Sequence, residues 1–322
     1  MGGYGSSMKL SIIICVYNEE KSIGPLIKNL VNQKIPPEFS SREIIVVASG
    51  CTDGTVKIVK QLMAKHNEVR IIEEKERNGK ASALNKAFAA SNGDCIVLVP
   101  GDVHPVDGAL FSLLVPFRDR RVSAVSGRPM QDPQNSPRAF MGYLANMTYR
   151  LWGRLMTKLN DMGQAAHCSG EFMAIRSDVK TLIPEECAAD DAYIAIIAKR
   201  KGLIHFAPKA VCYNLLPSNL TDYVNQRRRW LYGHFQTKKF TGEYPKVLDT
   251  MILSKPSLVL KVITDEIVER PGEVRYLLTA IVVEVAIFTL SILDHVFGRQ
   301  YGIWPSIKST KYVEAKMLEG KF

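Results

Sequence analysis

Short apolar runs alternate with helical periodicity over the first hundred residues of the chain. The runs are LSIIICV (10–16), EIIVVA (43–48), VRII (69–72) and CIVLV (95–99), and the helical segments between them include GKASALNKAFAAS (79–91). This βαβαβαβ order predicts an α/β fold with a mostly parallel sheet flanked by helices. Ligands of such sheets bind beyond the carboxyl ends of the strands, so the polar loops VYNEE, ASGCTDGT and VPGDVHP should meet in one crevice.

The second half of the chain follows a different pattern. Helices are predicted over 137–160, 188–202 and 219–230, and a strand over 169–176. After Trp230 the alternation of strands and helices stops. Residues 246–270 look amphipathic, and residues 276–293 carry no charge apart from Glu284.

Composition limits the partners and the cellular setting. The net charge of +10 indicates polyanionic partners, which can be phosphorylated substrates, anionic lipids or nucleic acid. The six cysteines contain no CxxC pair, and Cys15 and Cys95 fall inside apolar strands, so we expect reduced core cysteines of a cytosolic protein. The opening MGGYGSS is interpreted as a non-native leader, and residues 1–8 are excluded from the fold.

The order of the motifs resembles that of a known family. VYNE, a T-D-G-T turn, GKASALNKA, an Asp-bearing loop after a strand, SGEF, an Asp-Asp pair and QRRRW follow one another as in the family-2 inverting glycosyltransferases, which have the GT-A fold. QRRRW matches the Q-x-x-R-W signature of the cellulose-synthase-like and hyaluronan-synthase-like branch. The order is far more specific than any single motif.

The resemblance implies a division of the chain. Residues 9–235 would form the GT-A domain, with a nucleotide-sugar-binding half at 9–130 and an acceptor half at 131–235. We expect residues 236–272 to form amphipathic helices at a membrane interface, and residues 273–322 to hold a transmembrane helix and a basic tail.

The resemblance also places a nucleotide-diphosphate sugar in the crevice. The residues expected to contact this donor are Val16, Tyr17, Asn18, Glu19, Ser49, Asp53, Lys80, Asp102, Gln226 and Arg229. Asn18 could also cap a helix, and Asp53 could instead organise a tight turn. Lys80 near a helix N-terminus opposes the helix dipole, and a bound diphosphate would compensate it. Because Ala48 and Ser49 stand where the family has two acidic residues, GDP-mannose is expected before a uridine donor.

The loop after residue 99 departs most from the family pattern. The family has Asp-x-Asp where this chain has Pro100-Gly101-Asp102, and His104 lies two residues further on. On an extended segment Asp102 and His104 would project to the same side. With the donor phosphates and water they could complete a Mn²⁺ or Mg²⁺ site. The alternative is a structural histidine after a strand.

The resemblance assigns the remaining site residues to the acceptor. Asp191 aligns with the general base, and Asp190 is assigned to helix capping and acceptor positioning. The acceptor contacts are expected from Ser169, Gly170, Glu171 and Trp230. The alternative for QRRRW is a basic solvated face with a core tryptophan, and we expect at least one of its three arginines to face solvent.

The C-terminal region bears on membrane association. Residues 276–293 would rise about 27 Å as a helix, close to the roughly 30 Å of a hydrocarbon core, which predicts a transmembrane helix. Glu284 would be costly in lipid, and the alternative is a buried core or dimer helix. Arg150, Arg154 and Lys158 recur every four residues, and this basic stripe favours a membrane surface.

One candidate span, or two at most, cannot build the secretion channel of a processive polysaccharide synthase from a monomer. We therefore expect an inverting, metal-dependent enzyme that adds one or a few sugars to a lipid-linked glycan at the cytosolic membrane face. No nucleic-acid partner is expected, and a homodimer is left open. The alternatives are a polyprenyl-phosphate glycosyl synthase, a UDP-sugar-using polysaccharide synthase and an inactive nucleotide-sugar-binding membrane scaffold.

Overall fold

An eight-stranded sheet forms the centre of the computed structural model, which describes residues 7–137, 139–299 and 307–311. The strand order is β3-β2-β1-β4-β7-β6-β8-β5. The strands are β1 (Met8–Val16), β2 (Phe39–Ser49), β3 (Val69–Glu74), β4 (Cys95–Pro100), β5 (His104–Pro105), β6 (Val122–Gln131), β7 (Met173–Arg176) and β8 (Leu203–Asn214). Most of the predicted leader and most of the predicted basic tail lie outside the described residues.

The first half of the sheet is parallel, as the sequence predicts. β1 pairs in parallel with β2 and β4, and β2 pairs in parallel with β3. The connecting helices are α1 (Ile23–Asn32), α2 (Thr55–Met63) and α3 (Gly79–Ala90). Ile12 and Ile14 of β1 join the core that contains α1 and α2, whereas Ile13 joins the core that contains α3. Both faces of these strands are therefore covered, which explains their continuous apolar sequences.

The second half of the sheet is mixed. β7 runs antiparallel to β4 and β6, β5 runs antiparallel to β8, and β6 and β8 are parallel. The helix α4 (Ala109–Leu114) packs in the same core as α1 and α2. The sequence did not reveal β6 and β8 because Gly127, Pro129 and Pro208 interrupt their apolar patterns.

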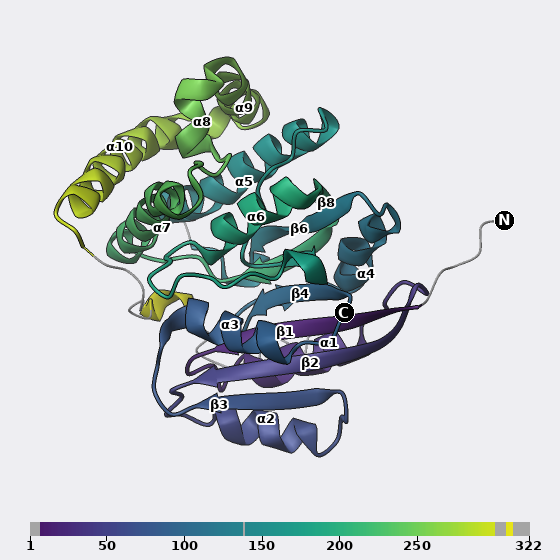
Figure 1. Ribbon diagram of the computed structural model, residues 1–322. Coiled ribbons are helices and arrows are strands. Elements are labelled where there is room, and N and C mark those ends of the chain that lie inside the picture. The colour runs from purple at the N-terminus through teal and green to yellow at the C-terminus, as the bar shows by residue number, and fades with distance from the viewer. Residues whose placement is uncertain (1–6, 138, 300–306, 312–322) are drawn as a thin grey trace.

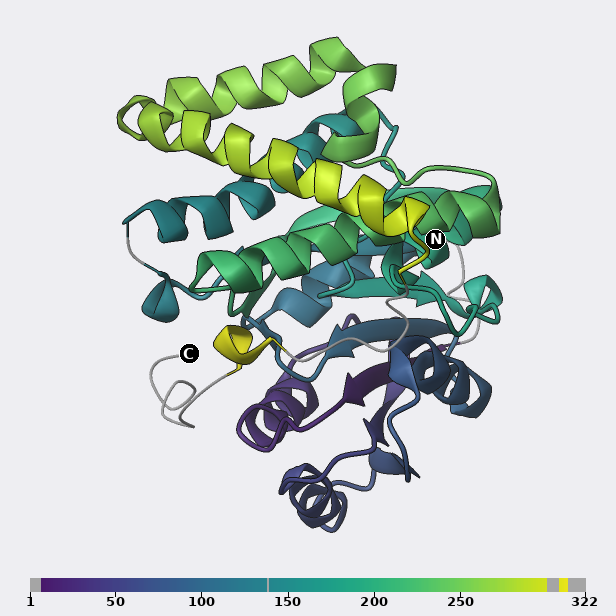
Figure 2. The same cartoon turned by 90° about the vertical axis from the view of Figure 1, so that its left-hand side faces the viewer.

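The helices from α5 onward gather at the end of the molecule away from α2 and β3 (Figure 1). They are α5 (Ala139–Asp161), α6 (Asp190–Lys201), α7 (Leu220–Thr241), α8 (Leu248–Ser254), α9 (Pro256–Glu269) and α10 (Val274–Val296). α7 continues through residue 235, so the domain boundary predicted there falls inside a helix. α10 lies lengthwise beside α7 (Figure 2).

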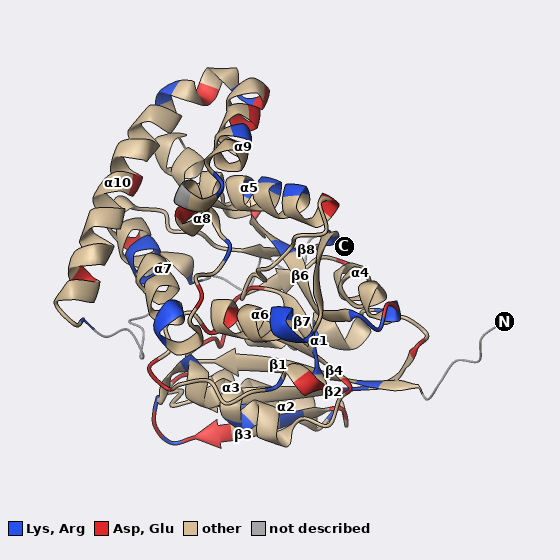
Figure 3. Ribbon diagram, turned by 45° about the horizontal axis from the view of Figure 1, so that its top comes forward, with Lys and Arg blue, Asp and Glu red and all other residues tan. Residues whose placement is uncertain are grey.

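The basic stripe of α5 is a contact with α9. Arg150 and Arg154 bind the two carboxylate oxygens of Glu266 at 2.7 and 3.2 Å, and Lys158 binds Asp265 at 2.6 Å. Glu266 is 1% exposed. Figure 3 shows the basic residues of α5 and the acidic residues of α9 on these two helices. The interpretation of this stripe as a membrane surface is therefore wrong, because its charges are neutralised within the protein.

Two carboxylates of the apolar helix α10 are turned toward α7. Glu284 accepts hydrogen bonds from Tyr223 and from Arg227, whose Nη2 lies 2.8 Å away, and Asp294 binds Arg228. Glu284 thus has a cationic partner in place of lipid, which removes the cost that its position in the sequence suggested. The expectation that at least one arginine of QRRRW faces solvent is wrong, because Arg227 and Arg229 are 6% and 8% exposed and the side chain of Arg228 is 21% exposed.

The part of the chain that the structure describes contains one candidate membrane helix and all six cysteines. Among the described residues, Pro271–Val296 is the helical segment that is long and apolar enough to cross a membrane, with a mean hydropathy of 2.3. Only 22% of the most apolar stretch of this segment is buried, so the segment is not a core helix. All six cysteines are free, and both Cys15 and Cys95 lie in strands, as expected.

Replacing Glu266 with Gln should lower the free energy of unfolding by roughly 3 kcal/mol, because the change removes the buried carboxylate that the largely buried guanidinium groups of Arg150 and Arg154 share. Urea unfolding followed by circular dichroism measures this. Glu269→Gln is the matched control on the same helix, since Glu269 pairs with Arg154 at a side chain that is 60% exposed. That variant should lose less than about 1 kcal/mol. Equal losses in both variants would show that the contact between α5 and α9 does not depend on the buried carboxylate.

Candidate active site

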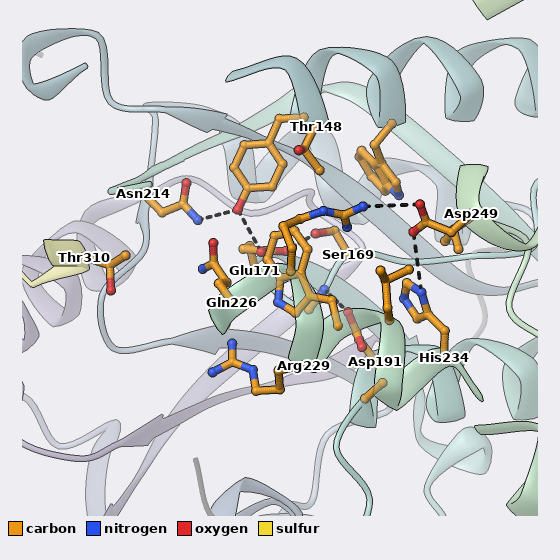
Figure 4. A pocket seen from close by; sticks show the side chains of 18 of the residues that line it. Thr148, Ser169, Glu171, Asp191, Asn214, Gln226, Arg229, His234, Asp249 and Thr310 are labelled. Carbon is orange, nitrogen blue, oxygen red and sulfur yellow. Dashed lines mark hydrogen bonds and ion pairs between the residues drawn. The ribbon is translucent and has the colours of Figure 1, made fainter. Parts of the chain in front are cut away.

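A cavity of about 730 Å³ opens beyond the carboxyl ends of β1 and β4. Its walls come from the ends of these strands, the start of α6, and helices α5, α7, α8, α9 and α10. Figure 4 shows Glu171 from the turn before β7, Asp191 from α6, and Gln226 and Arg229 from α7 around it. The crevice predicted at the strand ends is thus present, and the helical layer deepens it.

The structure brings most of the predicted site residues together. Those that line the cavity are Tyr17, Glu19, Lys80, Asp102, Ser169, Gly170, Glu171, Asp190, Asp191, Gln226, Arg229 and Trp230. The predicted residues that do not line it are Val16, Asn18, Ser49, Asp53 and His104.

The acidic pair begins α6 and its first member is bound to Lys80. The ammonium of Lys80 lies 2.9 Å from Oδ2 of Asp190. Burial alone would lower the pKa of Lys80, but Asp190 and Asp191 outweigh it and the pKa is raised, so the lysine stays charged. Asp190 therefore compensates the cation that the sequence analysis left to a diphosphate. The capping role predicted for Asp190 is wrong, because Ala189 occupies the N-cap position.

Asp191 is held by backbone amides at the cavity wall. Its Oδ2 accepts a hydrogen bond from the Gly170 amide at 3.0 Å, and its Oδ1 accepts one from the Ala192 amide at 2.8 Å. A Cβ added at Gly170 would lie 3.0 Å from Oδ2 of Asp191, so a larger residue would push the carboxylate away. The SG dipeptide of the sequence thus fixes the orientation of the predicted base.

Two cations, Lys80 and Arg229, lie among carboxylates at the end of the cavity next to β1 and β4. Burial lowers the pKa of Arg229 to about 10, although Asp190 and Asp102 favour its charged form. Burial raises the pKa of Asp102, although Lys80 and Arg229 oppose this. Both cations remain protonated at neutral pH, so this end of the cavity can bind an anionic group.

A network of hydrogen bonds fixes the side chains around Glu171 of the SGEF motif, which the sequence assigns to acceptor binding. Glu171 accepts hydrogen bonds from the Tyr149 hydroxyl at 2.9 Å and from Ser169, and Asn214 donates to the Tyr149 hydroxyl at 2.7 Å. Trp230 stacks on Tyr149 with ring centroids 6.4 Å apart. Burial raises the pKa of Glu171. The network holds a flat aromatic surface next to polar groups that can accept and donate hydrogen bonds to a sugar.

Hydrogen bonds hold the loops after β1 and β2 against each other. Asp53 accepts hydrogen bonds from the Thr55 amide at 3.0 Å and the Glu20 amide at 3.1 Å, so the tight-turn alternative for Asp53 is confirmed. Asn18 exchanges hydrogen bonds with Thr52, and Ser22 rather than Asn18 precedes α1. The helix-cap alternative for Asn18 is therefore wrong.

His104 is separated from Asp102. His104 lies on β5, paired with Tyr213 of β8, and is 6% exposed, and burial lowers its pKa to about 4. Asp102 lies in the preceding turn and lines the cavity, so the two side chains do not share an extended segment. Within the described ranges, no group of three or more His, Cys, Asp or Glu residues could hold a metal ion. Of the two predicted metal ligands only Asp102 lines the cavity, so a metal bound there would need further ligands from a donor.

Other lining residues were not identified from the sequence. The Arg77 guanidinium lies 4.0 Å from the centroid of the Tyr17 ring, and Lys311 binds Glu19, with burial lowering the pKa of Lys311 to about 8. His167 lines the cavity near Asp191, and burial lowers its pKa to about 4. These residues belong to no motif, so the sequence gives no sign that they line the cavity. The exception is His167, whose position two residues before SGEF could have indicated that it lies at the site.

Comparison with known proteins identifies relatives along most of the chain. Residues 8–233 match the family described as "Glycosyltransferase like family 2". "Probable glycosyltransferase YdaM" of Bacillus subtilis (strain 168) is 27% identical over 257 residues, covering 74% of this chain and 58% of its own length. "Poly-beta-1,6-N-acetyl-D-glucosamine synthase" of Staphylococcus aureus (strain COL) is 24% identical over 230 residues, covering 70% of this chain and 54% of its own length. The chain thus spans little more than half the length of these relatives.

A solved structure has the same fold. It is the "Mannosyltransferase PcManGT from Pyrobaculum calidifontis in complex with GDP-Man and Mn2+", with a TM-score of 0.61, 21% identity, and coverage of 92% of this chain and 89% of that one. This similarity confirms the GT-A fold that the sequence predicts. Together with the match over residues 8–233, it shows that the chain belongs to glycosyltransferase family 2.

Proposed function

We propose that the protein is an inverting glycosyltransferase that moves a sugar from a nucleotide-diphosphate sugar to a lipid-linked glycan. One observation carries this proposal: Asp191 lies in the same cavity as Lys80 and Arg229. A carboxylate can take the proton of an attacking hydroxyl, while the two cations stabilise the charge of a departing diphosphate. Both requirements of a single displacement are present in one site.

The donor we propose first is GDP-mannose. Ala48 and Ser49 replace the acidic residues of the base-binding turn in the family pattern. The Pyrobaculum neighbour was solved with GDP-Man, which supports the same class of donor here. Tyr17, with Arg77 over its ring, forms a flat surface at the cavity wall on which a base can stack.

We also propose that a divalent cation, Mn²⁺ or Mg²⁺, binds together with the donor. Asp102 would hold it from the cavity wall, and His104 is a second predicted ligand that does not line the cavity. When bound, such an ion supplies Lewis-acid neutralisation of the diphosphate. Asp102 would supply the acidic ligand of the ion, while Arg229 and Lys80 would bind the same phosphates directly.

Within this proposal Asp190 and Asp191 have different roles. Asp190 is neutralised by Lys80, so it is poorly placed to accept a proton. Asp191 keeps its carboxylate in place through two amide hydrogen bonds and remains the base. Trp230 and the polar groups around Glu171 would position the acceptor sugar so that its hydroxyl reaches Asp191.

The proposed setting is the membrane, on the cytosolic side. The rings of Tyr276 and Phe140 are 6.0 Å apart at one end of α10, Glu284 binds Arg227 at its middle, and Asp294 binds α7 near its other end. A helix fastened along its length in this way contacts a bilayer side-on, through its exposed apolar face. The transmembrane helix predicted over 276–293 would require these contacts to break.

A second candidate function is a polysaccharide synthase that uses a UDP-sugar. The match to a poly-N-acetylglucosamine synthase favours it, and that relative is nearly twice as long as the matched region. We place it second because Ala48 and Ser49 replace the acidic residues of the base-binding turn and because the Pyrobaculum neighbour was solved with GDP-Man.

Asp191→Asn should lower the transfer rate by about 10²–10⁴-fold while donor binding survives, because an amide cannot accept the proton of the acceptor. Transfer is measured with radiolabelled GDP-mannose and a total membrane fraction as the source of acceptor, and donor affinity is measured by calorimetry with GDP. The asparagine keeps the size of the side chain and can still accept the hydrogen bond from the Gly170 amide.

Asp190→Asn is the matched control, because it makes the same change one residue earlier. It should cost less rate and leave donor affinity unchanged or tighter, since it frees Lys80 from the carboxylate with which a diphosphate has to compete. If Asp190→Asn loses turnover and Asp191→Asn keeps it, the two roles are reversed. If both variants transfer normally, the base lies elsewhere.

Asp102→Asn should weaken Mn²⁺-dependent binding of GDP at least tenfold (about 1.4 kcal/mol), because the amide loses the charge that a hard cation prefers. His104→Gln should change it less than about twofold, because the imidazole does not line the cavity. The measurement is calorimetric titration of GDP in Mn²⁺ and in chelator. A tenfold loss in His104→Gln would instead establish it as the second ligand, and an unchanged Asp102→Asn would remove the metal site from this loop.

A further inference from the structure

The cavity has two ends of opposite chemistry. One end holds Lys80, Asp190, Asp191 and Arg229. The other end extends between α5, α8, α9 and α10 and is lined by apolar side chains, among them Leu151, Leu248, Val259, Ile263 and Leu277. The sugar chemistry proposed above needs the polar end and gives no role to this apolar arm.

The apolar arm reaches the surface between α8 and α10. Ile252 of α8 and Ile281, Val285 and Phe288 of α10 line the cavity, yet they are 55%, 45%, 61% and 38% exposed. Side chains that are both lining and exposed mark the rim of an opening. This rim is apolar on both sides, and we call these four residues the portal.

The charged groups near the portal are turned inward and paired. Glu284 and Asp249 also line the cavity, and both bind Arg227, at 2.8 and 3.2 Å. Arg227 is 6% exposed, and its single charge faces two carboxylates, so this cluster forms a polar floor with a formal charge of −1 between the portal and the catalytic end. The four rim residues themselves are uncharged, so a molecule that passes the rim meets apolar side chains first.

The apolar surface continues outside the portal. Leu278 and Val282 of α10 are 63% and 69% exposed and do not line the cavity. The outer face of α10, which we propose to contact the bilayer, is thus continuous with the rim of the opening. A hydrocarbon chain could pass from one to the other without crossing a polar surface, whereas a glycan would leave its hydroxyls without partners in the apolar arm.

We propose that the apolar arm binds the hydrocarbon chain of the acceptor, which enters sideways from the membrane through the portal. This inference rests on the proposed function, since it places the head group of the acceptor at Asp191. It assigns a class to the acceptor: a glycolipid with a flexible chain, held at both its sugar and its tail. The chain then supplies binding energy remote from the reacting hydroxyl, which can hold that hydroxyl in position.

The test uses n-alkyl β-glucosides from butyl to octyl as probes, titrated calorimetrically into the full chain below their micelle concentrations. In wild-type protein each added methylene should tighten binding by about fourfold, because it leaves water for the apolar arm. Val285→Glu should lose this dependence on chain length, since it places a charge in the rim.

Val282→Glu is the matched control. It makes the same change on the same helix, at a side chain of similar exposure that does not line the cavity, and it should keep the fourfold step. Ile252→Glu on the opposite rim should lose the step as Val285→Glu does, which separates blockage of the portal from a local defect in α10. Circular dichroism and unfolding curves of each variant show that it folds.

Two results would overturn the proposal: a chain-length step that is equal in Val285→Glu and Val282→Glu, or no step in wild-type protein. The second result would favour a glycan or water in the arm. Binding of GDP-mannose to wild-type protein separates this inference from the donor proposal. If GDP-mannose binds and the chain-length step is absent, the proposal that a hydrocarbon chain enters through the portal is wrong. If the step is present and GDP-mannose does not bind, the proposal for the apolar arm stands and the proposed donor is wrong.

Discussion

Three consecutive arginines on α7 connect the apolar helix α10 to the catalytic cavity. Arg227 binds Glu284, Arg228 binds Asp294, and Arg229 lines the cavity. Successive helical residues point about 100° apart, so one short segment can reach the inner face of α10 and the site together. Removing Glu284 would leave Arg227 with Asp249 alone, and removing Asp294 would take away the carboxylate that Arg228 binds, so either change weakens the charge balance around a poorly solvated guanidinium group. The position of α10 and the shape of the cavity therefore depend on the same turn of helix.

The cations of the site face carboxylates before any ligand binds. Lys80 is paired with Asp190, and the pKa of Arg229 is lowered by burial although Asp102 and other carboxylates favour its charge. An incoming diphosphate would compete for these cations and loosen their contacts with the carboxylates. Asp191, held by backbone amides, does not depend on either cation for its orientation. Donor binding can thus rearrange the ion pairs while the base stays in place.

The sequence predicts best what is encoded locally. Runs such as 10–16 and 95–99 are apolar because both faces of the sheet are covered, so their strands were identified correctly. Most of the site residues predicted from the motif order line the cavity. Partners distant in the chain could not be predicted: the basic stripe of α5 carries no sign that Glu266 neutralises it, and the loop around Asp102 carries no sign that His104 would pair with β8. Such contacts depend on packing, which the one-dimensional pattern does not contain.

A single displacement assisted by Asp191 inverts the configuration of the anomeric carbon. The direct measurement is proton NMR of the sugar released when water slowly replaces the acceptor, recorded before the free sugar equilibrates. With an α-linked donor such as GDP-mannose, the account predicts that β-mannose appears first and that α-mannose follows only by mutarotation. Release of α-mannose first would mean retention, and it would contradict the assignment of one base and one displacement to this cavity.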